Sequence, residues 1–377
     1  MGTHLAHRGA KPFRLGTRWA GGRAALCASL LLSGLLAGCA AREGDVAPAL
    51  TATPAAPVWP SPPDVARYAL AGVLIGEQDF VAPEDRESSG ARTAFEWIVG
   101  LVVGPRRYKE LRRPVAGLVR DDGSVLVVDA GHKGVAVFDM VAKRFEIWDE
   151  AAPGVGFVSP VAIAEDGSGG YLVTDAELRR VIRLDALGKP AGDFGGGILT
   201  RPTGIARDPL TGTIYVADTG AHDIKAFDES GLLIDTIAGP GRGVGRLNTP
   251  THMVFHEGRL YVADTLNFRV QAFNRDGTPV FDFGELGLSV GNMSRPKGVA
   301  IGGEGRIYVV ESYYDYLLIF DSSGQLLLPI GGTGREVGQF YLPAGVWTDN
   351  QHRVYVADMF NGRIIVLTEL TEMEARP

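Results

Sequence analysis

Short apolar stretches alternate with turns rich in Gly, Asp and Pro along most of the chain. Between Pro202 and Gly245, apolar runs cover 203–206, 214–217, 224–227 and 232–237, and each run ends in a turn that contains Asp or Gly. Runs of this length, rich in β-branched and aromatic residues and bounded by such turns, are typical of β-strands. The pattern therefore predicts four antiparallel strands within one unit of about 45 residues.

The same unit occurs six times. Each copy begins with a Pro, and an acid follows an apolar run about 15 residues later. The acids lie 43 to 47 residues apart. The prolines are Pro114, Pro160, Pro202, Pro250, Pro296 and Pro343, and the acids are Asp129, Asp175, Asp218, Asp264, Glu311 and Asp358. A four-stranded repeat of this period predicts an all-β fold, a six-bladed β-propeller of four-stranded antiparallel blades.

The sixth copy ends after its third strand, near Leu367, and would leave an open sheet edge. Exposed edges promote aggregation and are normally covered. Residues 68–75 resemble the fourth strand at 326–330, so we predict that they form the outer strand of the last blade and close the ring. The propeller is then expected over 67–370, with a longer insertion at 81–113, in which 91–103 forms a helix or hairpin, and a tail at 371–377.

The N-terminus has the features of an export signal. Five basic residues precede the apolar run 24–36, which is too short to span a bilayer comfortably. Residues 36–39 resemble a bacterial lipobox, which implies cleavage after residue 38 and lipid, including palmitate, on Cys39. The alternatives are an ordinary secretory signal with a chance Cys or an uncleaved anchor. Residues 39–66, rich in Ala and Pro, are predicted to be an extended tether. Because Ala40 is not Asp, Gram-negative sorting rules favour the outer membrane.

Cysteine content and charge narrow the chemistry. The only two cysteines are Cys27, inside the signal, and Cys39, so the mature domain can form neither a disulfide nor a Cys-ligated metal site. The chain carries −7, and removal of the five basic residues of the signal leaves −12. Such an acidic domain is a poor candidate for binding nucleic acid, which needs basic patches.

The sequence motifs of the repeat resemble those of the NHL repeat. The shared elements are Pro-x-Gly-Val/Ile, Ile/Val-Tyr-Val-Ala-Asp, Asn-x-Arg-Ile/Val and Phe-Asp-x-x-Gly, and residues 261–271 and 355–364 match best. The resemblance covers roughly 68–370 and implies a six-bladed propeller that binds ligands on its loops.

The six acids have two interpretations. A ring of carboxylates at the channel mouth would suit Ca²⁺ or another divalent cation, with Asp129, Asp175, Asp218, Asp264 and Asp358 as candidate ligands. Alternatively, each acid caps its own turn through backbone N–H groups. Repetition in every blade favours the second interpretation. Arg180, Arg269 and Arg363 are expected to pair with these acids.

Two departures from the repeat are candidate ligand-binding sites. The residue two after each Pro is Ala or Gly in five copies but His252 in the fourth, and Lys297 of the next copy is expected beside it. A residue that breaks a local rule without structural gain indicates function, although His252 would also fit as a residue that fills the channel mouth. The fifth copy reads Glu311-Ser-Tyr313-Tyr314-Asp-Tyr316 where its siblings are polar. Aromatic side chains on a loop suit either a binding surface or packing between blades.

Two function classes remain. The first is a non-catalytic scaffold on the cell envelope that binds a protein, a peptide or a glycan and is held on the membrane by its lipid. The alternative is a metal-dependent propeller enzyme, lyase- or lactonase-like, with its site at the channel mouth. NHL relatives include a peptide-amidating lyase whose metal-binding histidines directly follow Pro. No Pro-His pair occurs here, so that site does not carry over and the scaffold is the expected function.

Overall fold

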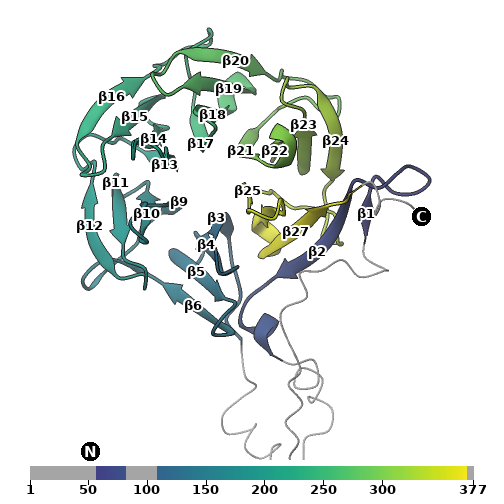
Figure 1. Cartoon of the computed structure of the whole chain (residues 1–377), viewed down its shortest axis with the longest axis horizontal. Helices are drawn as coiled ribbons and strands as arrows, with labels where there is room; N and C mark the ends of the chain where they lie inside the picture. The colour runs from purple at the N-terminus through teal and green to yellow at the C-terminus, as the bar shows by residue number, and fades with distance from the viewer. Residues whose placement is uncertain (1–56, 82–107, 372–377) are drawn as a thin grey trace, which may run out of the picture. The chain divides into compact units, whose positions relative to one another are not determined.

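Six antiparallel sheets of four strands stand around a central axis and form a six-bladed β-propeller, as predicted (Figure 1). The computed structural model describes residues 57–81 and 108–371, all within the compact unit Val46–Pro377. The expected signal, the predicted lipidation site Cys39 and the predicted helix or hairpin at 91–103 lie outside the described residues. Within the described residues, no helix is long and apolar enough to cross a membrane.

Each of the first five blades uses four consecutive strands. Blade 1 consists of β3 (Pro114–Val119), β4 (Val125–Asp129), β5 (Gly134–Asp139) and β6 (Arg144–Trp148). Blade 2 consists of β9 (Pro160–Glu165), β10 (Tyr171–Asp175), β11 (Arg180–Leu184) and β12 (Pro190–Phe194). Blade 3 consists of β13 (Pro202–Arg207), β14 (Ile214–Asp218), β15 (Asp223–Phe227) and β16 (Leu233–Ile237). The strands of blade 3 agree with the predicted runs to within one residue at each end.

Blades 4 and 5 follow the same order. Blade 4 consists of β17 (Pro250–His256), β18 (Arg259–Asp264), β19 (Arg269–Asn274) and β20 (Pro279–Phe283). Blade 5 consists of β21 (Pro296–Ile301), β22 (Ile307–Glu311), β23 (Tyr316–Phe320) and β24 (Leu326–Gly331). A small hairpin of β7 (Glu150–Ala152) and β8 (Val155–Gly156) connects blades 1 and 2. The sequence pattern did not predict this hairpin.

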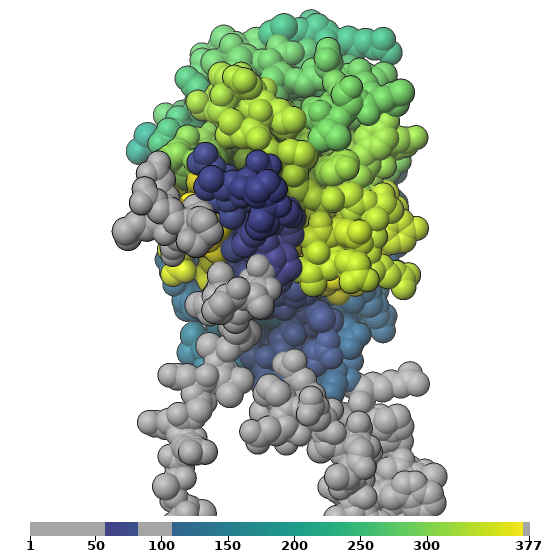
Figure 2. Space-filling model, turned by 90° about the vertical axis from the view of Figure 1, so that its right-hand side faces the viewer, coloured from purple at the N-terminus to yellow at the C-terminus, as the bar shows by residue number. Residues whose placement is uncertain are grey.

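Blade 6 closes the ring with strands from both ends of the fold. β25 (Val346–Thr348), β26 (Val354–Asp358) and β27 (Arg363–Glu369) are followed by β2 (Tyr68–Leu74), which pairs antiparallel with β27. The predicted closing strand at 68–75 is therefore confirmed. In Figure 2 the N-terminal segment, purple, lies against yellow C-terminal residues. A short strand that was not predicted, β1 (Val58–Trp59), pairs with β2 and extends this sheet to five strands.

The second strand of every blade lies inside the protein, apart from the exposed Arg259 that begins β18. All residues of β4, β10, β14, β22 and β26 are buried. One apolar cluster joins Val128, Leu172 and Val216, which come from three consecutive blades. Both faces of each middle strand therefore pack against other blades, which explains their continuous apolar runs. The outer strands instead expose residues to solvent, as in β12 and β16.

The innermost strands approach one another closely at the position two after the repeated Pro. A Cβ on Gly204 would lie 2.9 Å from the Cα of His252, and one on Gly298 would lie 2.9 Å from the carbonyl oxygen of Ala344. A Cβ on Gly345 would lie 2.3 Å from the carbonyl oxygen of Val115. The small residues of the repeat are thus needed where neighbouring blades touch around the channel.

Candidate functional site at the channel mouth

An acidic residue is the last residue of the second strand in each of the six blades. These six carboxyl groups lie on one face of the ring, and we call this face the mouth face. It carries the loops before each innermost strand and the loops between each second and third strand. Asp129 connects the two kinds of loop, because it accepts hydrogen bonds from the backbone N–H of Arg112 at 2.7 Å and from that of Gly131 at 2.8 Å. Asp175 does the same with Val158 and Leu178.

The remaining acids are similarly held. Asp218 accepts from the backbone N–H of Thr200 at 2.7 Å, and Asp358 accepts from that of Tyr341 at 2.8 Å. All six side chains are buried, and none is more than 1% exposed. Burial raises the pKa of Asp358 and of Glu311, and the backbone hydrogen bonds that each accepts oppose that rise.

The acids do not assemble a metal-binding group in the part of the chain that the structure describes. No three His, Cys, Asp or Glu side chains among residues 57–81 and 108–371 lie close enough to hold one ion together. Each carboxylate instead faces the backbone of its own loops, which is the geometry of a turn cap. The described residues therefore do not fit a cation ringed by the six carboxylates.

The basic partners follow the predicted pairing in two blades of three. Arg269 Nε lies 3.0 Å from Asp264, and Arg363 Nε lies 2.8 Å from Asp358. The prediction for Arg180 was wrong, because its guanidinium pairs with Asp193 of β12 at 3.0 Å. In blades 4 and 6 an Asn three residues after the acid donates to the same carboxylate, whereas blade 2 has Leu at that position and the Arg180 Nε donates to its carbonyl.

His252 belongs to β17, the innermost strand of blade 4, and its Cα lies against Gly204 of blade 3. Its neighbour Thr251 donates a hydrogen bond to the carbonyl oxygen of Lys297 at 3.0 Å, which holds β17 against β21. The imidazole is partly buried and makes no side-chain hydrogen bond to another described residue. Burial and, second to it, the positive charge of Lys297 lower the pKa of His252 to about 4. The ring is therefore neutral at physiological pH and can donate or accept a hydrogen bond.

Lys297 lies beside His252, as expected from their places in the repeat. Its side chain is partly buried, and burial lowers its pKa. The charges of Arg295 and Arg113 act in the same direction. Side chains of blades 1, 4 and 5 therefore meet at one end of the channel, although more than 180 residues separate Arg113 from Lys297 in the sequence.

The aromatic loop of blade 5 divides into two parts. Tyr316 begins β23 and packs against a buried apolar cluster, so its role is in blade packing. Tyr313 is 60% exposed, and its ring meets that of Tyr314 edge to face at 4.8 Å. The buried Glu311 accepts hydrogen bonds from the backbone N–H groups of Tyr314 and Arg295, so the exposed Tyr313 and the partly buried Tyr314 lie beside the basic end of the channel.

The described cavities lie elsewhere. A cavity of about 300 Å³ lies at the opposite end of the channel, where Val119, Ile301 and Thr348 end their strands and His256 and His352 contribute to the lining. A larger pocket of about 920 Å³ lies between β2 and blade 5. The residues that line them come from strands and turns that share no recognisable motif, so sequence reasoning missed both.

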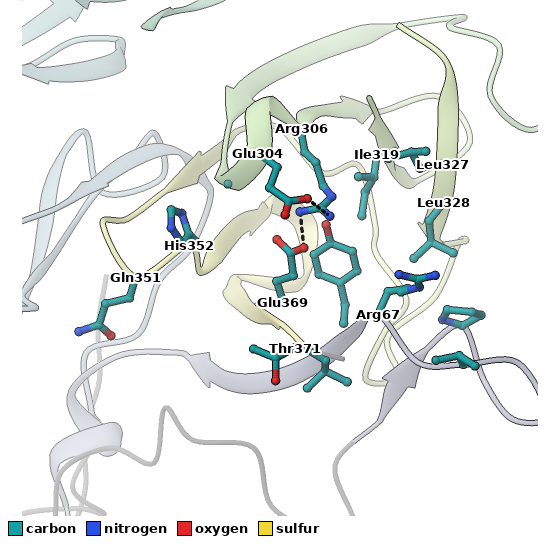
Figure 3. Close-up of a pocket in the computed structure, with 15 residues that line it drawn as sticks. Arg67, Glu304, Arg306, Ile319, Leu327, Leu328, Gln351, His352, Glu369 and Thr371 are labelled. Carbon is teal, nitrogen blue, oxygen red and sulfur yellow. Dashed lines mark hydrogen bonds and ion pairs between the residues drawn. The ribbon is translucent and has the colours of Figure 1, made fainter. Parts of the chain in front are cut away.

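The larger pocket has an apolar wall and a charged wall (Figure 3). Leu327 and Leu328 line one side. On the other, Arg306 pairs with Glu304 at 2.8 Å and with Glu369. The charges within this pocket therefore neutralise one another, unlike those at the channel mouth.

Comparison with known proteins supports the fold alone. No protein-family model matches the chain, and no curated protein sequence is similar to it. A streptogramin B lyase structure is 14% identical with a TM-score of 0.52, and the alignment covers 68% of this chain and 93% of that one. An auxiliary nutrient binding protein from Bacteroides thetaiotaomicron is 13% identical with a TM-score of 0.54, and the alignment covers 69% of each chain. A gluconolactonase from Xanthomonas campestris is 16% identical with a TM-score of 0.54, over 69% of this chain and 87% of that one.

The fold and the channel mouth define the class of protein. The chain is a six-bladed β-propeller, closed by β2, whose repeat is interrupted on one face by His252, Lys297 and the exposed Tyr313. Its similarity to a lyase, a lactonase and a nutrient-binding protein is a similarity of architecture, and architecture alone does not determine function.

Proposed function

We propose that this protein is a non-catalytic binding scaffold of the cell envelope, of the NHL type, that takes its ligand at the mouth face of the propeller. One observation carries the proposal: the residues that break the repeat gather on this face. His252 and Lys297 form no hydrogen bond or ion pair with another described side chain, and Tyr313 is exposed. Polar and aromatic groups placed at a channel mouth and left without structural partners suit ligand binding.

The proposal includes membrane attachment through lipid on Cys39. The support is the lipobox-like sequence at 36–39 and the Ala- and Pro-rich segment 39–66. Acyl chains on one cysteine would hold the protein on a membrane and leave the mouth face free to collect a ligand. Replacement Cys39→Ser is expected to move the protein from the membrane fraction to the soluble fraction. Retention of the variant on membranes would contradict the lipid anchor.

The alternative is a metal-dependent enzyme, lyase- or lactonase-like, with its site at the channel mouth. The neutral imidazole of His252 favours it, because an unprotonated His is a metal ligand or a general base. The similar structures include a streptogramin B lyase and a gluconolactonase, and this analogy of fold also favours the enzyme alternative. Metal analysis of the purified mature protein and of His252→Ala separates the two proposals. Stoichiometric metal that is lost in the variant would overturn the scaffold.

The scaffold is tested directly by capture from envelope extracts. Immobilised mature protein is compared with the double variant Tyr313→Ala/Tyr314→Ala and with Leu210→Ser, which changes a 77% exposed residue in the β13–β14 turn, away from the mouth face. We expect the double variant to lose the captured component and Leu210→Ser to retain it. Equal capture by all three proteins would refute the placement of the ligand on the mouth face.

A further inference from the structure

The basic residues at the channel mouth occupy matching positions in different blades. Arg113 and Arg295 each precede the Pro that begins an innermost strand, and Lys297 follows such a Pro. The innermost strands touch in sequence around the channel, because Thr251 of β17 bonds to the backbone of Lys297 in β21 and Gly345 lies against Val115. The three cationic side chains therefore lie at one level of the ring.

The side chains of these cations have no ion-pair partner among the described residues, although the carboxylates of Asp129 and Glu311 accept hydrogen bonds from the backbone N–H groups of Arg113 and Arg295. Neither Arg113, Arg295 nor Lys297 forms an ion pair or a side-chain hydrogen bond there, and none of the charges that act on Lys297 is negative. Arg201, which holds the equivalent position in blade 3, shows the contrast: it pairs with Glu177 at 3.0 Å.

Like charges held together oppose folding unless something compensates for them. The neutral ring of His252 does not compensate for these positive charges, but it adds a hydrogen-bonding group next to the ammonium of Lys297. Arg295 also lies against the tyrosine loop, since the N–H of Ser312 donates to its carbonyl oxygen at 3.1 Å. The mouth thus presents positive charge at its centre and exposed aromatic rings at its rim.

We infer that the channel mouth binds a ligand with clustered negative charge, carried by phosphate or carboxylate groups, which lies between Lys297, Arg295 and Arg113. His252 donates a hydrogen bond to the same ligand or accepts one from it. Tyr313 and Tyr314 contact the less polar part of the ligand. Arginine and lysine are the side chains that proteins use to recognise such groups. This inference rests on the proposed binding function and adds the charge class of the ligand.

The test is titration calorimetry of the mature protein with two probes, pyrophosphate and citrate, at low ionic strength and at about 0.15 M salt. We expect at least one probe to bind, with weaker affinity at the higher salt. Lys297→Met is expected to weaken binding by about tenfold or more, because it removes a charged hydrogen-bond donor. Binding of pyrophosphate alone indicates phosphate recognition, and binding of citrate alone indicates carboxylate recognition.

Matched variants keep the result interpretable. Lys189→Met removes the same charge from an exposed site just before β12 and is expected to bind as the wild type does. Lys297→Arg is expected to restore most of the affinity. Arg113→Gln changes an exposed residue and is expected to weaken binding. It replaces Lys297→Met as the test if that variant does not fold.

The inference would be overturned if neither probe bound the wild type. It would also be overturned if Lys297→Met and Arg113→Gln both bound the probes with the same affinity as the wild type. The proposed function fails separately. If the envelope component is captured through the tyrosine loop but Lys297→Met captures it equally well, the ligand is not recognised by its charge and the scaffold stands. If nothing is captured through the mouth face, the scaffold itself is contradicted.

Discussion

The pH dependence of stability should change when His252 is replaced by Gln. In the folded protein the pKa of His252 is about 4, against 6.5 for an ordinary histidine. As the pH falls below 6.5, the unfolded chain takes up a proton on this residue before the folded protein does. The free energy of unfolding therefore falls between about pH 6.5 and pH 4 and receives no further loss from this group at lower pH.

The size of the effect follows from the shift. Each pKa unit corresponds to about 1.4 kcal/mol, so a shift from 6.5 to about 4 removes about 3 kcal/mol of stability from the wild type on acidification. His252→Gln lacks the titrating group and should escape this loss. Because the carboxyl groups titrate in both proteins, the informative quantity is the difference in unfolding free energy between the two at each pH.

The assay is urea denaturation of the mature wild type and the variant at pH 7, 5.5 and 4.5. We expect the stability difference to shift in favour of His252→Gln as the pH falls. Lys297→Met supplies a second comparison: it removes a charge that lowers the pKa of His252, so its acid sensitivity should be smaller than that of the wild type. If wild type and His252→Gln lose stability in parallel from pH 7 to 4.5, the lowered pKa of His252 is refuted.

Three further predictions concern the scaffold, each measured by urea denaturation. Asp264→Asn should destabilise the fold by about 3 kcal/mol or more, because it removes a fully buried carboxylate that pairs with Arg269 and leaves the guanidinium with only one carboxylate, that of the partly exposed Asp282; an effect below 1 kcal/mol would refute the pair as a structural element. Tyr68→Phe should cost about 1–3 kcal/mol by leaving the buried Tyr308 hydroxyl unpaired, whereas the variant with both tyrosines changed to Phe should be nearly neutral; equal losses would contradict the 3.1 Å hydrogen bond between the two hydroxyls. Gly345→Ala should cost about 1–3 kcal/mol through contact with the neighbouring innermost strand, and a neutral result would mean that the ring is looser than described.

Much of the fold is predictable from the sequence because the same pattern recurs six times. A single run such as 214–217 is ambiguous, but six copies at one period leave one architecture. The closing strand was also predictable, since an edge left open by β27 has to be covered and 68–75 reads like the other outer strands. Short elements escaped prediction: β1 has two residues, and its Trp59 is positioned by tertiary packing against blade 6.

The candidate site was predictable only where it departs from the repeat. His252 and Lys297 stand out against the small or apolar residues of their sibling positions, and the structure brings them together. Arg113 and Arg295 were missed, because they lie in turns where charged residues are ordinary. Only the ring brings Arg113 close to Lys297. The prediction for Arg180 was wrong because Arg180 lies at the same spacing from its acid as Arg269 and Arg363 do, yet pairs with a different carboxylate, that of Asp193.

The most direct test of the central claim is an NMR titration of the His252 imidazole in the mature protein with pyrophosphate and with citrate. The account predicts that the ring signals of His252, assigned by their loss in His252→Gln, shift on addition of an anion. It also predicts that the pKa of His252 rises above about 4 in the complex, because a bound anion stabilises the protonated ring. Unchanged His252 signals and an unchanged pKa with both anions at saturating concentrations would contradict a binding site at the channel mouth for ligands with clustered negative charge.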